Sequence, residues 1–172
     1  MFTLKSSAFA DGGTIPENFT EMSIVSPPLS WEDAPKGTKS FALTMTDPDV
    51  PAFFNFPRVL AHWMVCNIPA SVNSLPEGAS PGGKLPEGAV DINSDFITSF
   101  NVPNYPRGYA GPWPPDAPHR YVFTLYALKT ENLDIDPAVD FTEFVKAVLP
   151  QTITTASLTG IYGPAKNPLP GS

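Results

Sequence analysis

Proline occupies 22 of the 172 positions of this chain, more than twice its usual share of about 5 %. Proline fixes the backbone angle φ and removes a hydrogen-bond donor, so helix interiors and central strands exclude it. Hydrophobic residues still make up 42 % of the chain, which is enough to build a core. The prolines are therefore expected in the turns, loops and strand edges of a mostly β fold. The length fits a single domain that spans residues 1–172.

The charge and hydropathy of the chain limit its partners. Ten basic and 17 acidic residues give a formal net charge of −7 at pH 7, and a field of this sign repels nucleic acids and anionic membrane surfaces. No apolar stretch approaches the ~20 residues of a membrane span, and residues 1–7 are too short and polar for a signal peptide. We expect a cytoplasmic protein with no nucleic-acid partner. The single cysteine, Cys66, excludes an internal disulfide and a cysteine-rich zinc site, and its apolar neighbours predict a buried thiol.

Four segments have the character of strands. Phe41, Leu43 and Met45 alternate with smaller residues over 40–46, the period of two that a strand requires. The remaining strands are predicted over 62–68, 121–128 and 157–162, and the large residues on both faces of 121–128 suit a central strand.

One helix is predicted near the end of the chain. Its apolar stripe consists of Phe141, Phe144, Val145, Val148 and Leu149. Asp140 and Glu143 have the spacing of a capping box, and Pro150 is expected to end or kink the helix. Strands followed by a late helix indicate a β-rich or α+β fold with the helix at its periphery.

The long middle segment, 69–118, contains the rigid block Tyr109–Pro115. Three prolines within four residues, from Pro112 to Pro115, fix much of its backbone. A wall of this kind suits the preorganised rim of a binding site, and loops this long inside a compact domain commonly carry function.

The only two histidines, His62 and His119, each lie at the start of a predicted strand, and Asp47 ends the strand over 40–46. If the two histidine strands are neighbours, the three side chains meet at one end of a sheet. They could bind an anion, bind a metal or transfer protons. These residues also have structural interpretations. Each histidine could have its hydrogen bonds satisfied within the protein, and Asp47-Pro48-Asp49 could form a turn. The neighbouring Arg120 could form an internal ion pair. No nucleophile elbow, phosphate-binding glycine loop or zinc-binding helix motif is present, and we expect no metal or cofactor.

Four motifs follow one another along the chain: Asp47-Pro48-Asp49-x-Pro51, His62-Trp63-x-Val65-x-Asn67-Ile68-Pro69, Gly111-Pro112-x-Pro114-Pro115 and His119-Arg120-Tyr121-x-Phe123-Thr124-Leu125-Tyr126-Ala127-Leu128. With the flanking segments 9–16, 26–38 and 158–163, they cover nearly the whole chain. This pattern resembles the phosphatidylethanolamine-binding protein family, and more narrowly its bacterial and archaeal members called Raf-kinase-inhibitor-like.

The resemblance implies antiparallel β-sheets packed face to face, with one or two peripheral helices near the C-terminus. It also implies a small surface pocket for phosphate-like or carboxylate anions. Carried over by position, the ligand-binding residues are Asp47, His62, Gly111, Pro112, His119 and Tyr121, with Tyr109 on the rim. Asp47 is expected to orient a histidine and raise its pKa. Asp49 and Arg120 are assigned to an ion pair beneath the pocket. Bacterial relatives make a homodimer an expectation as well.

Several residues depart from the family pattern. Trp113 stands where relatives usually have a small residue or cysteine, and Asn55-Phe56-Pro57 lacks an aromatic hydroxyl found in some of them. The segment Ile97–Arg107 is long, and Phe53, Phe54 and Phe56 add apolar bulk beside Asp47. These departures predict a more enclosed and more hydrophobic pocket than phosphate alone requires.

Three functions follow from the sequence. The first is a regulatory, non-enzymatic module that binds a small anionic or phosphorylated ligand. The second is an inhibitor that docks on a kinase or protease, for which the protein partner would contact an apolar patch at Phe53–Phe56. The third is an enzyme in which Asp47, His62 and His119 perform acid–base chemistry on a hydrophobic small molecule.

Overall fold

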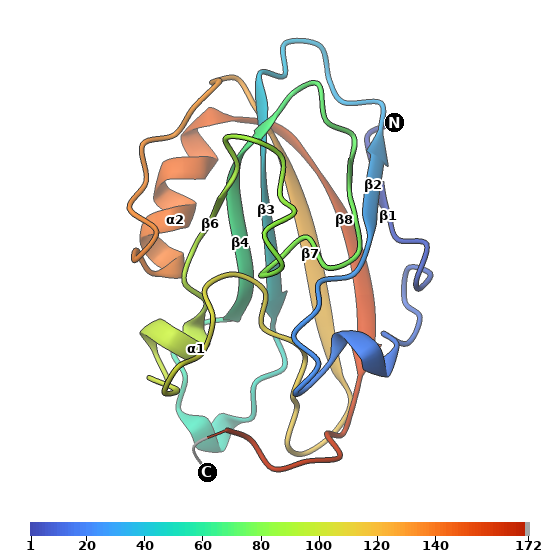
Figure 1. The fold of residues 1–172 in the computed structure, drawn as a ribbon, viewed down its shortest axis with the longest axis vertical. Helices are drawn as coiled ribbons and strands as arrows, with labels where there is room; N and C mark the ends of the chain where they lie inside the picture. Colours follow the sequence, from blue (N-terminus) through green and yellow to red (C-terminus); the bar gives the residue numbers. More distant parts are fainter. Residues whose placement is uncertain (171–172) are drawn as a thin grey trace.

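The alternating segment of the sequence forms β3 (Ser40–Asp47), the central strand of the fold. The structure, a computed structural model, describes residues 1–170. β3 is the middle strand of a five-stranded antiparallel sheet with the order β6-β4-β3-β7-β8, and a three-stranded sheet has the order β1-β2-β5 (Figure 1). The other strands are β1 (Thr3–Lys5), β2 (Leu29–Glu32), β4 (Leu60–Pro69), β5 (Ser74–Leu75), β6 (Val90–Asp91), β7 (His119–Leu128) and β8 (Thr152–Tyr162).

Alternate side chains of β3 enter two different cores. Phe41 belongs to the core between the two sheets, where its ring centroid lies 5.4 Å from that of Trp31 on β2. On the opposite face, Ala42 and Cys66 pack against the helix α2 (Phe141–Val148). Cys66 is buried, which confirms the predicted buried thiol. This burial raises the pKa of the thiol to about 11. The expected arrangement of antiparallel sheets packed face to face, with a helix on the flank, is confirmed as well.

The helix α2 begins and ends close to the predicted residues. The carboxylate of Asp140 accepts a hydrogen bond from the backbone N–H of Glu143 at 2.9 Å, which caps the first turn. The helix ends at Val148, and the proline that follows lies in the 3₁₀ turn η3 (Leu149–Gln151). Leu149, which the apolar stripe included, lies beyond the helix and is exposed, so the predicted stripe is one residue too long.

The remaining helical segments are short. They are α1 (Asp95–Thr98) and the 3₁₀ turns η1 (Glu17–Phe19) and η2 (Ala52–Phe54). Within residues 1–170, no helix combines the length and apolar character needed to cross a membrane. The middle segment 69–118 contains α1, β5 and β6, so it is not one structureless loop.

The topology brings the candidate residues to one end of the larger sheet. β3 runs antiparallel to both β4 and β7, so its last residue, Asp47, lies where those two strands begin. His62 is near the start of β4, and His119 is the first residue of β7. The sequence-based expectation assumed that the two histidine strands are neighbours, and this assumption is wrong. β3 lies between them and contributes the aspartate. The segment after β8 runs along this same end towards η2 (Figure 1).

The cap of α2 makes a measurable contribution to stability. Asp140→Ala leaves the N–H of Glu143 without its acceptor, and we expect it to lower the free energy of unfolding by about 1 kcal/mol. Urea denaturation measures this change. Asp134→Ala, at an exposed aspartate in the preceding loop, is the control and should change stability by less than about 0.5 kcal/mol. Equal effects of the two substitutions would contradict the capping role.

Candidate functional site

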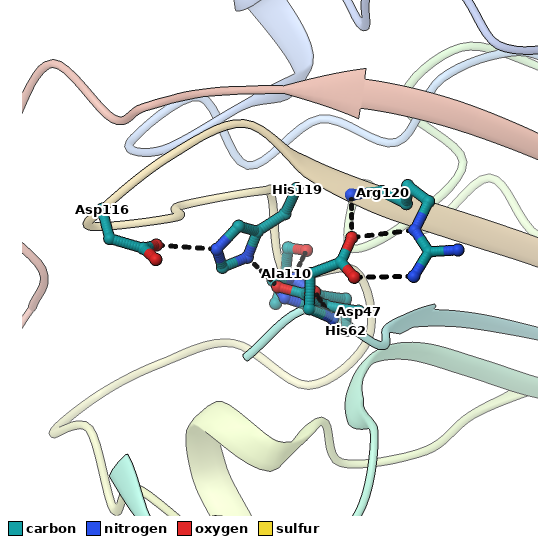
Figure 2. A network of polar contacts seen from close by, with 7 residues as sticks. Asp47, His62, Ala110, Asp116, His119 and Arg120 are labelled. Atoms are coloured by element: carbon teal, nitrogen blue, oxygen red, sulfur yellow. Dashed lines mark hydrogen bonds and ion pairs between the residues drawn. The ribbon is translucent and has the colours of Figure 1, made fainter. Parts of the chain in front are cut away.

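Asp47 links the end of β3 to the start of β7. Its Oδ1 accepts the backbone N–H of Asp49 at 2.7 Å, so the predicted turn is present. Its Oδ2 lies 2.6 Å from Nδ1 of His119 (Figure 2). Both residues are almost completely buried. The carboxylate therefore fixes the turn and the orientation of the imidazole at the same time.

His119 is held between two carboxylates. Its Nδ1 faces Asp47, and its Nε2 lies 2.7 Å from Oδ1 of Asp116 (Figure 2). A carboxylate oxygen can only accept, so a ring bonded to two carboxylates donates from both nitrogens and carries a positive charge. Burial opposes this charge, but the hydrogen bonds and charges of Asp47 and Asp116 outweigh it and raise the pKa of His119. The ring is only 3 % exposed, whereas the side chain of Asp116 is 39 % exposed.

His62 has the opposite character. Its Nδ1 donates to the backbone carbonyl of Ala110 at 2.8 Å, which fixes one proton on that nitrogen. Its Nε2 has no hydrogen-bond partner within residues 1–170, although the residue is only 1 % exposed. Burial lowers the pKa of His62, and the opposing charge of Asp47 does not reverse this shift. His62 is therefore neutral and presents a free acceptor nitrogen.

Tyr121 separates the two imidazoles. Its ring meets His62 edge-on with the centroids 5.2 Å apart, and it stacks on His119 with the centroids 6.4 Å apart. Burial, together with the negative charge of Asp47, raises the pKa of the Tyr121 hydroxyl, so this group keeps its proton at neutral pH.

These four side chains line one small cavity. Its volume is about 30 Å³, close to the volume that one water molecule occupies in the liquid. The rest of the wall is mostly apolar and comes from the loop after β3, the segment around α1, the proline block and the C-terminal segment. Those residues are Val50, Pro51, Phe54, Leu60, Phe96, Phe100, Trp113, Pro114, Pro115 and Leu169. The cavity thus combines the polar side chains of Asp47, His62, His119 and Tyr121 with an otherwise mostly apolar wall.

Trp113 fastens the C-terminal segment over the cavity. Its indole Nε1 donates to the backbone carbonyl of Asn167 at 2.9 Å, and the side chain is nearly buried. Leu169, two residues further on, lines the cavity. A small residue at position 113 would supply neither this donor nor this bulk, so Trp113 contributes directly to the enclosure.

Glu21 provides a second anchor for the same segment. This buried carboxylate accepts hydrogen bonds from the hydroxyl of Tyr162, from the backbone N–H of Lys166 at 3.1 Å, and from Asn167 through its backbone N–H at 3.0 Å and Nδ2 at 2.9 Å. Burial raises the pKa of Glu21, but these hydrogen bonds outweigh burial and the pKa is lowered. Glu21 could not be predicted from the sequence, because its partners lie more than 140 residues away along the chain and no local pattern marks it.

Three of the candidate ligand-binding residues lie outside the cavity wall. Tyr109 is fully buried, with its hydroxyl donating to the carbonyl of Phe19 at 2.7 Å, so its predicted position on the rim is wrong. Gly111 and Pro112 pack behind the wall. The carbonyl of Pro112 accepts from the N–H of Glu21 at 3.0 Å, and a Cβ at Gly111 would come within 3.0 Å of the same Phe19 carbonyl. A side chain at this position would require the neighbouring backbone to move by a few tenths of an ångström, so glycine suits the close approach.

The Asp49–Arg120 ion pair exists, but its position differs from the prediction. Arg120 contacts Asp49 through Nη2 at 2.7 Å and through Nε at 3.0 Å. More than half of the Arg120 side chain is exposed, so the pair lies on the surface rather than beneath the pocket. Among residues 1–170, no group of three or more His, Cys, Asp or Glu side chains is arranged to hold a metal ion.

Comparisons with known proteins show the family and the fold of the chain. The family model described as phosphatidylethanolamine-binding protein matches residues 5–163. A UPF0098 protein of Methanothermobacter thermautotrophicus is 39 % identical over 160 residues, which cover 92 % of this chain and 97 % of that protein. The crystal structure of a phosphatidylethanolamine-binding protein homolog from Chlamydia trachomatis superimposes with a TM-score of 0.80 at 34 % identity, covering 95 % of this chain and 97 % of the other. The crystal structure of Escherichia coli YbcL, described as a member of the mammalian PEBP family, gives the same TM-score and identity over 95 % and 98 % of the two chains.

The two histidines should titrate on opposite sides of the ordinary imidazole pKa of 6.5. We expect the pKa of His119 above this value and that of His62 below it, and the NMR signals of the ring protons report both. Asp116→Asn removes one carboxylate from His119 and should lower its pKa, while that of His62 stays below 6.5. A pKa of His119 below 6.5 in the unmodified protein would contradict the two-carboxylate geometry.

Proposed function

The chain belongs to the phosphatidylethanolamine-binding protein family, and we propose that its cavity binds the oxyacid head group of a small anionic ligand. One observation carries the proposal. Within residues 1–170 the buried Nε2 of His62 has no hydrogen-bond partner, and His62 lines the same cavity as the charged ring of His119. A buried polar atom without a partner is costly, and a ligand oxygen in the cavity would satisfy it.

The protonation of His62 determines how an oxyacid binds. A fully ionised oxygen only accepts hydrogen bonds, and so does Nε2 of neutral His62. A proton must therefore lie between them, supplied either by the acid group or by His62 from solution. Where His62 takes the proton, the imidazolium and the ionised oxygen form a strong, charge-assisted hydrogen bond. Binding of a fully ionised ligand takes up one proton.

His119 supplies the positive charge of the site. In the free protein, this charge is balanced by Asp47 and Asp116. Asp47 is buried and also fixes the turn, whereas Asp116 lies on the partly exposed loop before β7. Of the two, Asp116 is the carboxylate that a ligand oxygen could replace at His119. A ligand oxygen must displace the Asp116 carboxylate from His119, which lowers the affinity for weak ligands.

The size of the cavity limits what enters it. A volume of about 30 Å³ is small compared with the roughly 300–1,000 Å³ of sites for drug-sized molecules, so the cavity suits a head group rather than a whole ligand. The remaining atoms of the ligand then lie at the mouth, unless Trp113 and the C-terminal segment move outward. The name of the family refers to a phospholipid with a phosphate in its head group, which is consistent with an oxyacid at this position.

The proposal is tested by titrating inorganic phosphate into the protein. The ring-proton signals of both histidines should shift together and saturate. Calorimetry in two buffers of different ionisation enthalpy then distinguishes the two proton sources: no proton is taken up where an O–H of the phosphate donates to Nε2, and one is taken up where His62 becomes protonated. Because the pKa of free His62 is lowered, affinity should rise as the pH falls and level off below that pKa. His62→Ala should abolish saturable binding, whereas Lys84→Gln, at an exposed cation distant in sequence, should not. If neither histidine signal responds to phosphate, the proposal is wrong.

A second function, acid–base catalysis, is favoured by the opposite pKa shifts of the two histidines. Neighbouring groups whose pKa values are pushed apart are suited to act as base and acid. His62 would accept a proton at its free Nε2, and His119 would stabilise developing negative charge. Asp47 would act through His119 as a positioning residue.

Catalysis predicts a rate with two titrating groups. For a substrate that the protein turns over, we expect a bell-shaped dependence of kcat/KM on pH, limited by protonation of His62 at low pH and by deprotonation of His119 at high pH. His62→Gln should lower kcat by about 100-fold or more. An unchanged rate in His62→Gln would exclude His62 as the base.

A further inference from the structure

A second hollow adjoins the cavity on its outer side. Its volume is about 660 Å³, and it shares Phe54, Phe96, Phe100 and Leu169 with the wall of the inner cavity. None of the residues that line it carries a charge. We refer to this hollow, lined by residues 54, 96, 99–103, 169 and 170, as the aromatic groove.

Aromatic rings connect the groove with the floor of the cavity. The centroid of Phe54 lies 6.3 Å from that of Phe100, which lies 5.9 Å from that of Phe96. The Phe96 centroid is in turn 5.3 Å from that of His62. These separations fall in the range of favourable ring–ring contacts. A continuous row of rings therefore leads from the surface to the unpartnered nitrogen of His62.

Two rings of this row are incompletely covered. Phe54 is 37 % exposed and Phe100 is 38 % exposed, and both line the cavity as well as the groove. Large aromatic side chains that remain exposed beside a hollow commonly mark a binding surface. A flat apolar group in the groove would cover both rings, and it would gain edge-to-face or offset contacts with them.

Together, the cavity and the groove have the polarity of an amphipathic ligand. The titratable groups Asp47, His62 and His119 line the inner cavity, and the groove is uncharged and lined mainly by aromatic and aliphatic side chains, with Ser99 and Asn101 as its polar members. The groove volume lies within the range of sites for drug-sized molecules, about 300–1,000 Å³. One ring system with a short linker suits this space, whereas two long acyl chains would extend well beyond it.

Resting on the function proposed above, we infer that the ligand is an aromatic oxyacid: one acid oxygen bonds to His62, and its aromatic ring lies in the groove against Phe54 and Phe100. The groove then determines which acid is selected, and the histidines hold the acid group itself. This assignment gives the unusual phenylalanines of the loop after β3 and of the segment around α1 a role in specificity.

The test compares three ligands that share one head group: inorganic phosphate, hexyl phosphate and phenyl phosphate. Calorimetry should show phenyl phosphate binding about tenfold or more tightly than inorganic phosphate, the gain that burial of one ring corresponds to. Phenyl phosphate should also bind more tightly than hexyl phosphate. In Phe100→Ala, the ratio of the affinities for phenyl phosphate and inorganic phosphate should fall to near one. Leu149→Ala is the control and should leave this ratio unchanged, because Leu149 is an exposed apolar residue that lines neither hollow.

Other outcomes overturn the inference in distinguishable ways. If inorganic phosphate binds but phenyl phosphate binds no more tightly, the groove is not part of the site and the proposed function stands. If hexyl phosphate binds as tightly as phenyl phosphate, the groove accepts apolar tails and the aromatic class is wrong. A dimer in sedimentation velocity that Phe100→Ala dissociates would show that a second copy covers the groove. If none of the three ligands binds, the proposed function itself fails.

Discussion

The buried contact between Asp47 and His119 is the interaction on which the rest of the site depends. It joins the end of β3 to the start of β7, at 2.6 Å and with almost no solvent access. A charged imidazole in such surroundings is stable only with a hydrogen-bonded counter-charge. Asp47 supplies that charge, and Asp116 adds a second from the surface side. His62, which meets the ring of Tyr121 edge-on, is neutral, and its Nε2 has no hydrogen-bond partner within residues 1–170.

The enclosure of the cavity depends on contacts across the whole chain. Glu21 near the start and Trp113 in the proline block both hold the segment that follows β8. Their partners include the backbone N–H groups of Lys166 and Asn167 and the carbonyl of Asn167, so the main chain of the segment is held directly. This path brings Leu169 to the cavity and the groove. The same contacts thus determine both how little solvent reaches His62 and how wide the mouth is.

Much of the fold could be predicted because it depends on local patterns. The alternation around Phe41 specifies β3, and Asp140 with its apolar stripe specifies α2. β8 begins earlier than predicted, at Thr152, because its threonine-rich first half is exposed and lacks an apolar signal. The meeting of Asp47, His62 and His119 could be predicted from their positions at strand ends, although β3 separates the histidine strands.

The remaining features of the site depend on burial and on distant contacts, which no local pattern records. Tyr109 is predicted on the rim of the pocket, yet it lies in the core. There its hydroxyl donates a hydrogen bond to the backbone carbonyl of Phe19, from a distant part of the chain. The opposite charge states of the two histidines follow from two carboxylates at one ring and a single carbonyl at the other.

The direct test of ligand binding at a neutral His62 is the ¹⁵N chemical shift of its Nε2, measured at neutral pH with and without saturating phosphate. We expect this nitrogen to be unprotonated in the free protein, and its chemical shift to move towards the protonated or strongly hydrogen-bonded value when phosphate binds. A nitrogen that is already protonated in the free protein, or one whose signal stays unchanged at saturation, would contradict this expectation.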